Sequence, residues 1–214
     1  EAPQGRIIQP QSLALRELLD HGVVTLVLQD KELLFALQSF KIPPQLVVTD
    51  SQAFQHVSAT VPTEIPLTSF SILMARQRGD LTIYLQGLGA IPTLQDGDRI
   101  LIAELCSHRP IGEDIGRIKI PQWLTKNTGK SLQFEIASGK DFPNDLTAFK
   151  LIIQCGGCMV NRAMIQSRLK QAREQNVPIT NYGLAIAHLQ GILPRAILPF
   201  PDAYRVWESL RAKS

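Results

Sequence analysis

Three cysteines are the residues of this chain whose type and spacing could do chemistry. Cys155 and Cys158 lie in "QCGGCMVNR", two residues apart, and Cys106 lies in "ELCSHRPIGED" together with His108. Three cysteines cannot all pair within one chain, whereas a secreted disulfide framework normally has an even number of them. Reduced thiols that act as metal ligands or redox groups are therefore the better interpretation.

Three kinds of site fit these residues. A zinc site of three cysteines and one histidine would use Cys106, His108, Cys155 and Cys158. A thioredoxin-like dithiol would use Cys155 and Cys158 alone, and would leave Cys106 unexplained. An iron–sulfur cluster would take the three thiolates and leave one iron with a different or exchangeable ligand. Unrelated core cysteines are the fourth alternative, and spacing alone leaves all four open.

The segment around the two neighbouring cysteines suits a bound metal centre. Gly156 and Gly157 let the main chain pass close to such a centre and turn N–H groups toward it. Asn161 is a good N-cap for a helix over residues 162–176. The positive end of that helix would favour an anionic, thiolate-bound group nearby.

The cysteines follow stretches that are typical of buried strands. Residues 96–105 predict a turn and a strand, with Cys106 at its end, and residues 149–154 predict another strand directly before Cys155. Ligands of open parallel sheets bind outside the carboxyl ends of the strands. Two such ends can lie side by side, so the sequence predicts that Cys106, Cys155 and Cys158 meet at one rim of the sheet.

The remaining pattern predicts an α/β protein of two small domains, each a mainly parallel sheet flanked by helices. The first domain spans residues 1–66, including an N-terminal linker, and the second spans residues 67–214. The first sheet is so small that its edge strands invite pairing with another copy. Strands are expected over residues 23–28, 45–50, 131–138 and 177–183, with one more within 58–66. Helices are expected over 14–20, 31–40, 51–57, 68–79, 80–94, 162–176, 184–193 and 202–213.

Composition narrows the possible partners. Of the 214 residues, the first 100 carry a net charge of −3 and the rest +6, so all three cysteines lie in the basic part. A basic surface suits an anionic guest or an acidic partner. Nucleic acid is not expected, since no Lys/Arg run is interleaved with aromatic residues. No apolar run is long enough to cross a bilayer. "NTGKS" (127–131) has Leu124 where a phosphate-binding loop needs glycine, so a surface turn is expected there.

Four segments together resemble the HydF family, the GTPase scaffolds that mature iron-only (FeFe) hydrogenases. They are "AELCSHRPIGEDIGRIKIPQWL", "GKDFPNDL", "KLIIQCGGCMVNR" and "VPITNYGLAIAHLQGIL". The resemblance extends over essentially the whole chain. It implies a dimerisation domain followed by an iron–sulfur cluster-binding domain, with the family's GTPase domain expected before Glu1.

The resemblance also implies a ligand set. A 4Fe-4S cluster would be held by Cys106, Cys155 and Cys158, with Glu113 or His108 as candidates for the fourth iron. The resemblance favours the Glu113 carboxylate, a hard oxygen donor that is displaced more easily than a thiolate. Many relatives have histidine where this chain has Gln154, so that ligand is not available here. Arg109 and Arg162 flank the site, and each could hold an anionic guest or pair with a carboxylate.

The function implied by the resemblance is that of a scaffold, carrier and chaperone in hydrogenase assembly. The protein would receive a transient two-iron subcluster precursor from radical-SAM maturases and deliver it to apo FeFe-hydrogenase. We expect a cytoplasmic homodimer without nucleic-acid or membrane partners. No base, nucleophile or nucleotide site is apparent, so this chain is not expected to be an enzyme. A structural zinc module that mediates protein contacts is the alternative.

Overall fold

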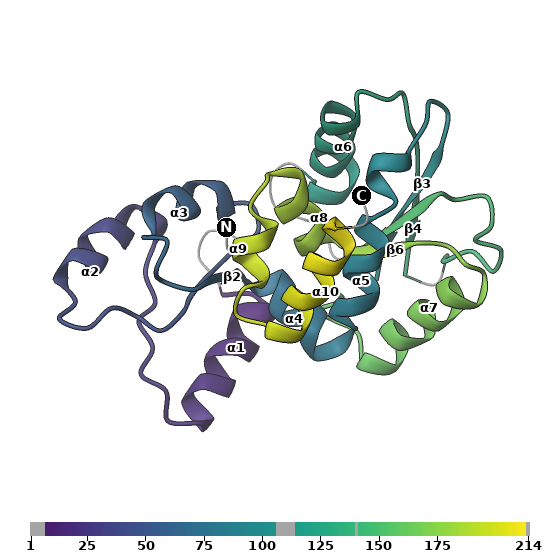
Figure 1. The fold of residues 1–214 in the computed structure, drawn as a ribbon. Coiled ribbons are helices and arrows are strands. Elements are labelled where there is room, and N and C mark those ends of the chain that lie inside the picture. The colour runs from purple at the N-terminus through teal and green to yellow at the C-terminus, as the bar shows by residue number, and fades with distance from the viewer. Residues whose placement is uncertain (1–6, 106–113, 140, 213–214) are drawn as a thin grey trace.

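The computed structural model describes residues 7–105, 114–139 and 141–212, and it shows two parallel sheets with helices around them (Figure 1). The predicted fold class, α/β with two small parallel sheets flanked by helices, is confirmed. In Figure 1 the lobe with α1 to α3 projects to the left and the larger sheet lies to the right.

The N-terminal lobe is built on a sheet of two short strands. β1 (Val47–Thr49) pairs in parallel with β2 (Leu67–Ser69). The predicted strand within residues 58–66 is wrong, because its first residues end helix α3 and β2 begins only after Pro66. The helices of the lobe are α1 (Gln9–Asp20), the one-turn η1 (Asp30–Glu32), α2 (Leu33–Ser39) and α3 (Phe54–Thr60).

The predicted strand over residues 23–28 does not form in the single chain. These residues join no sheet, and Val24 is fully exposed. The sequence "VVTLVL" is apolar and rich in β-branched residues, which suits a strand buried on both faces. Within the described lobe no second layer covers it, so tertiary context decides against the local preference.

Two capped helices connect the lobe to the larger sheet. Ser69 accepts a hydrogen bond from Ile72 N at the start of α4 (Phe70–Arg78). Asp80 accepts from Thr82 N and Ile83 N at the start of α5 (Leu81–Leu88), which η2 (Ile91–Thr93) follows. Such caps satisfy N–H groups that have no partner within the helix.

The larger sheet has four parallel strands in the order β4-β3-β5-β6. Their bounds are β3 Arg99–Glu104, β4 Gln133–Ser138, β5 Leu151–Gln154 and β6 Ile179–Asn181. β3 and β5 are direct neighbours, with Ala103 opposite Gln154. The prediction that these two strands end side by side is therefore confirmed.

Helices cover both faces of this sheet. The crossover from β3 to β4 contains η3 (Ile115–Lys119), a single π-helical turn, and α6 (Ile120–Thr128), and the crossover from β5 to β6 contains α7 (Arg162–Glu174). These crossovers run in opposite directions across the sheet, so right-handed connections place α6 and α7 on opposite faces, as Figure 1 shows. The C-terminal helices are α8 (Tyr182–Leu189), α9 (Leu193–Ile197) and α10 (Pro201–Arg211).

α6 was not expected from the sequence, and the "NTGKS" segment lies at its end. Gly129 adopts the left-handed conformation (φ 66°) that commonly ends a helix. The expected turn is thus present, and it is a helix C-terminus.

One continuous apolar core runs from Leu33 to Ala203. β2 lies just beyond the predicted domain boundary at residues 66/67, yet it pairs with β1 on the other side of that boundary. Arg195 of α9 donates to the carbonyl oxygens of Ser58 and Val61, at 2.7 Å each. The boundary itself stays a prediction.

Candidate metal centre

Cys155 lies at the carboxyl end of β5, against the end of β3. Its main-chain N–H donates to Ala103 O at 2.9 Å, which extends the ladder by one residue. Its Sγ accepts a hydrogen bond from the main-chain N–H of Leu105 at 3.1 Å. Leu105 is the residue that covalently precedes Cys106, so the chain entering the "CSH" segment is in contact with Cys155. We call this edge of the sheet, where β3 and β5 end, the carboxyl rim.

Several predicted ligands cannot be placed. Cys106, His108, Arg109 and Glu113 lie outside the described residues. Within the described ranges, no group of three His, Cys, Asp or Glu side chains could hold a metal ion. Cys155 and Cys158 are present as half-buried thiols rather than as a disulfide with each other. The ligand set of Cys106, Cys155, Cys158 and Glu113 or His108 therefore stays a prediction.

The two glycines between the cysteines form a tightly packed turn. Gly157 is buried and has a φ of +61°, which side chains other than glycine rarely adopt. A Cβ there would lie 2.8 Å from Ile165 Cδ1 and 2.9 Å from Leu105 Cδ1. At Gly156 a Cβ would meet nothing closer than 3.8 Å. Close packing and the positive φ explain why residue 157 is glycine, whereas position 156 has room for a side chain.

Arg78 holds this turn from helix α4. Its Nη1 donates to Gly157 O at 2.6 Å and to Val160 O at 2.8 Å. Gln166 of α7 in turn donates to the carbonyl oxygens of Arg78 and Gly79. Sequence reasoning missed Arg78, because nothing local links it to a turn 79 residues away.

The turn leads directly into helix α7, as the sequence predicts. Asn161 caps it, accepting from Met164 N at 3.0 Å. Arg162, the first residue of α7, is exposed and makes no hydrogen bond or ion pair within the described part of the chain. It is thus available to a guest at this end of the helix.

Gln154 faces away from the candidate centre. Its side chain is completely buried, and its Nε2 donates to the Tyr84 hydroxyl at 3.0 Å. Burial raises the pKa of Tyr84, so the phenol stays protonated. The replacement of histidine by glutamine here is accommodated by a hydrogen bond to α5.

Two further side chains at the rim were missed. Arg168 of α7 is only 5% exposed, and its Nη2 donates to Gly139 O at 2.5 Å, just after β4. Tyr182 follows β6, and its hydroxyl is buried against Gly116. Both interact electrostatically with Cys155. The sequence offered only their places in predicted elements as a signal: Arg168 lies in the predicted helix over residues 162–176, and Tyr182 lies near the end of the predicted strand over residues 177–183.

Two surface hollows lie away from the carboxyl rim. One cavity of about 480 Å³ is lined by residues that precede β3, β5 and β6, including Gln95, Lys150 and Pro178. It therefore lies at the amino end of the sheet, whereas ligands of parallel sheets bind at the carboxyl end.

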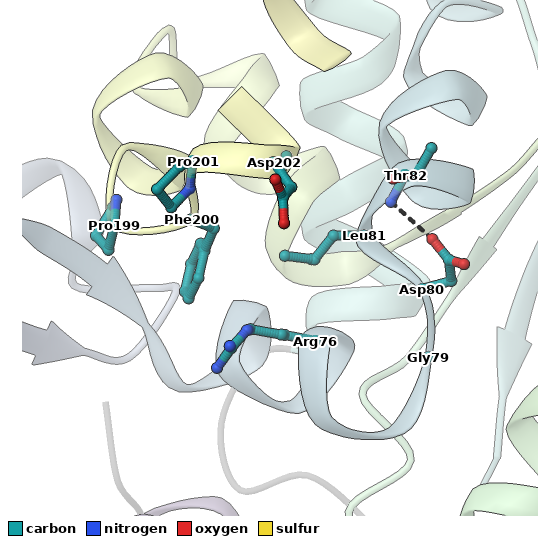
Figure 2. A pocket seen from close by; sticks show the side chains of 10 residues that line it. Arg76, Gly79, Asp80, Leu81, Thr82, Pro199, Phe200, Pro201 and Asp202 are labelled. Atoms are coloured by element: carbon teal, nitrogen blue, oxygen red, sulfur yellow. Dashed lines mark hydrogen bonds between the residues drawn. The ribbon is translucent and has the colours of Figure 1, made fainter. Parts of the chain in front are cut away.

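Figure 2 shows a second cavity, of about 320 Å³, between the start of α5 and the start of α10. Arg76 lies over the Phe200 ring, 5.5 Å from its centroid, and Asp80 caps α5 through Thr82 N. Of the two predicted ligands that the structure describes, neither Cys155 nor Cys158 lines this cavity.

The described residues fit a thiolate-bound anionic group. Two cysteines are brought to one rim, one of them already accepts a main-chain N–H, and a positive side chain lies near it. Hydrogen bonds from main-chain N–H groups stabilise thiolate-bound clusters. The set is compatible with an iron–sulfur cluster, and it is equally compatible with zinc.

Two family models match nearly the whole chain. A family model described as the hydrogen maturase F dimerization domain matches residues 1–79, and one described as the hydrogen maturase F tetramerization domain matches residues 82–199. No curated protein matches the chain. The two matches define a class of self-associating α/β proteins of hydrogenase maturation.

This chain belongs to the hydrogen maturase F family. The resemblance seen in the sequence is thereby confirmed. The second match is described by tetramerization, so the domain with the cysteines is also an association domain. None of the helices that the structure describes is long and apolar enough to span a membrane.

An exposed apolar surface in the N-terminal lobe fits the dimerization match. Among the described residues, most large apolar side chains that remain exposed come before residue 47. Val24 is fully exposed, Ile42 is 81% exposed and Phe35 is 76% exposed. Exposed large apolar side chains gathered in one lobe are typical of a surface that another chain covers. We call the exposed apolar residues of this lobe the apolar face; they are Ile7, Leu19, Val23, Val24, Leu26, Val27, Leu34, Phe35, Phe40, Ile42 and Leu46.

Proposed function

We propose that this chain is a scaffold and carrier that binds a 4Fe-4S cluster at the carboxyl rim. In this role it receives the two-iron subcluster precursor of FeFe-hydrogenase and delivers it to the apo-enzyme. Cys155 and Cys158 hold the cluster together with Cys106, and an exchangeable fourth ligand, Glu113 or His108, leaves one iron accessible. The cluster supplies an iron site to which a guest can bind. The chain supplies the thiolates, the N–H donors and the surrounding charge.

One contact carries this proposal. The hydrogen bond from Leu105 N to Cys155 Sγ joins two segments that are 50 residues apart in the chain. Each segment leads into or contains a cysteine of the predicted set. Membership of the hydrogen maturase F family supplies the chemical context, because maturation of this hydrogenase requires an iron-containing guest.

Self-association gives the scaffold its working form. We propose that the apolar face is the homodimer contact and that residues 23–28 pair as a strand in the dimer. An unpaired extended segment offers main-chain N–H and C=O groups to another chain. Radical-SAM maturases and apo-hydrogenase are the proposed partners, and the cytoplasm is the proposed compartment. The chain acts by binding and transfer rather than by catalysis.

A metal and sulfide analysis tests the proposal. The protein is reconstituted anaerobically with iron and sulfide, in parallel with a sample that also contains equimolar zinc. About four irons and four sulfides per chain, retained through gel filtration in both samples, are expected for a 4Fe-4S carrier. One zinc per chain that iron cannot displace, without sulfide, would make the site a closed structural zinc module and overturn the proposal.

A further inference from the structure

Two buried hydrogen-bond donors at the carboxyl rim lack an acceptor. Nη1 of Arg168 and the hydroxyl of Tyr182 are shielded from solvent, and neither has a hydrogen-bond partner among the residues that the structure describes. Buried polar groups in folded proteins are normally paired. Two orphaned donors near the same cysteine therefore need an explanation.

Arg168 is a buried positive charge. Its guanidinium lies over the Phe142 ring, 4.3 Å from the centroid, and its Nη2 is held by Gly139 O. Both of these contacts are with neutral groups, and within the described chain no carboxylate pairs with it. A guanidinium stays protonated in proteins, so its charge favours an anion nearby. Burial lowers the pKa of Arg168, and the negative charge of Cys155 acts in the opposite direction.

Tyr182 approaches Cys155 from helix α8. Its hydroxyl lies so close to Gly116 of η3 that a Cβ on that glycine would come within 2.1 Å of it. Burial raises the pKa of Tyr182, and the charges of Cys155 and Glu104 raise it further. The phenol therefore keeps its proton and can only act as an O–H donor toward an anion. π-helical turns such as η3 are frequent at functional sites.

We propose that Arg168 and Tyr182 together hold an anionic iron–sulfur group against Cys155. The guanidinium supplies a positive charge and one N–H, and the phenol supplies one O–H. This inference rests on the proposed function, because it requires an iron–sulfur group at the rim. Hydrogen bonds to the sulfur atoms and nearby positive charge raise the reduction potential of such a group. The group is either the resident cluster or the guest on its exchangeable iron.

The test uses the full chain, reconstituted anaerobically, with Arg168→Met, Arg168→Lys and Tyr182→Phe. The first readout is the midpoint potential of the cluster, from a redox titration followed by EPR. We expect Arg168→Met to raise the ratio of oxidised to reduced cluster about tenfold at a fixed potential, which is about 59 mV for one electron. Arg168→Lys should restore part of that change, and Tyr182→Phe should act in the same direction by less.

The second readout is the affinity for cyanide, a small anion that probes the exchangeable iron. A changed potential with unchanged cyanide affinity places the two donors on the resident cluster. A several-fold weaker cyanide affinity with unchanged potential places them on the guest. Either result supports the inference.

Arg195→Met is the matched control, because this guanidinium also binds main-chain carbonyls but does so in the N-terminal lobe. Tyr204→Phe is the control for the loss of a phenol. Both should keep the parent potential and cyanide affinity. If Arg168→Met fails to fold by circular dichroism, the isosteric Tyr182→Phe and the charge-conserving Arg168→Lys decide the question.

A fully assembled cluster with the parent's potential and cyanide affinity in Arg168→Met and Tyr182→Phe would overturn the inference while leaving the proposed function intact. A parent protein that takes up no iron would overturn the proposed function, and the inference with it.

Discussion

Arg78 Nη1 lies 2.6 Å from the carbonyl oxygen of Gly157, so helix α4 holds the turn between the two neighbouring cysteines. The same nitrogen also binds Val160 O, at 2.8 Å. The guanidinium thus fixes both ends of the segment from which Cys158 projects. The turn lies in the tetramerization match, whereas Arg78 lies in the dimerization match, so the geometry of the candidate centre depends on a residue from the other matched stretch.

Replacement of Arg78 by Met should loosen this turn. Hydrogen bonds from a charged group each contribute about 1.5–3 kcal/mol, so the free energy of unfolding should fall by at least the lower value. Hydrogen exchange should speed up at residues 155–161 before it does in β5. Arg205→Met, which removes an exposed partner of Asp202, is the control and should leave both measurements unchanged. Unaltered hydrogen exchange at residues 155–161 in Arg78→Met would show that Arg78 does not hold the turn.

Gly157→Ala should destabilise the fold more than Gly129→Ala. Both glycines have a positive φ, at 61° and 66°, so each substitution costs about 1–2 kcal/mol in backbone strain. Only at Gly157 would the new Cβ also crowd Ile165 and Leu105, which adds about 1–3 kcal/mol. Thermal unfolding should show midpoints that differ by about 2–4 °C per kcal/mol. Equal midpoints for the two variants would show that the turn is not tightly packed.

His188 should make stability depend on pH. It is partly buried and makes an edge-on contact with Trp207, and burial lowers the pKa of His188 from its ordinary value of 6.5. Below pH 6.5 the unfolded chain then binds more protons than the folded one, so stability falls as the pH drops from 6.5 to the folded-state pKa. Below that value, His188 causes no further loss.

Denaturant unfolding between pH 7.5 and pH 5 measures this effect. His188→Phe should flatten the pH dependence in that window, and His56→Gln, at an exposed position, is the matched control. If the stability of the parent and of His188→Phe depends on pH in the same way, His188 is not the group responsible.

A charge on the apolar face should weaken self-association. Val24→Lys places an ammonium group on the most exposed residue of residues 23–28, and burial of an unpaired charge in an interface is costly. Sedimentation velocity should show a lower oligomer population than for the parent. Gln55→Lys adds the same charge at an exposed position of α3 outside the apolar face, and it is the control that should leave association unchanged. Equal association of all three proteins would place the dimer contact elsewhere.

The larger domain could be predicted from sequence because its signals are local and agree with one another. β3 and β5 are apolar runs of strand length, α7 has a capping asparagine, and the rule for parallel sheets brings their ends together. The predicted strand over residues 23–28 does not form, for the opposite reason. Their strand preference needs a partner, and the single chain provides none.

The surroundings of the candidate centre could not be predicted, because they depend on long-range contacts. Arg78, Arg168 and Tyr182 belong to three different helices, and each reaches the rim through tertiary packing. A buried arginine on an amphipathic helix looks like a surface residue in sequence. Cys155 could be identified as a candidate ligand from the sequence, because the spacing of the cysteines is informative without a structure.

EPR of the anaerobically reconstituted and dithionite-reduced protein tests the central claim most directly. The parent, Cys155→Ser and Met159→Leu should be measured side by side. Met159 is an exposed residue of the same turn and is the control. The account predicts a reduced-cluster signal from the parent and from Met159→Leu, and none from Cys155→Ser, which has lost the thiolate held by Leu105. A full signal from Cys155→Ser would contradict the account.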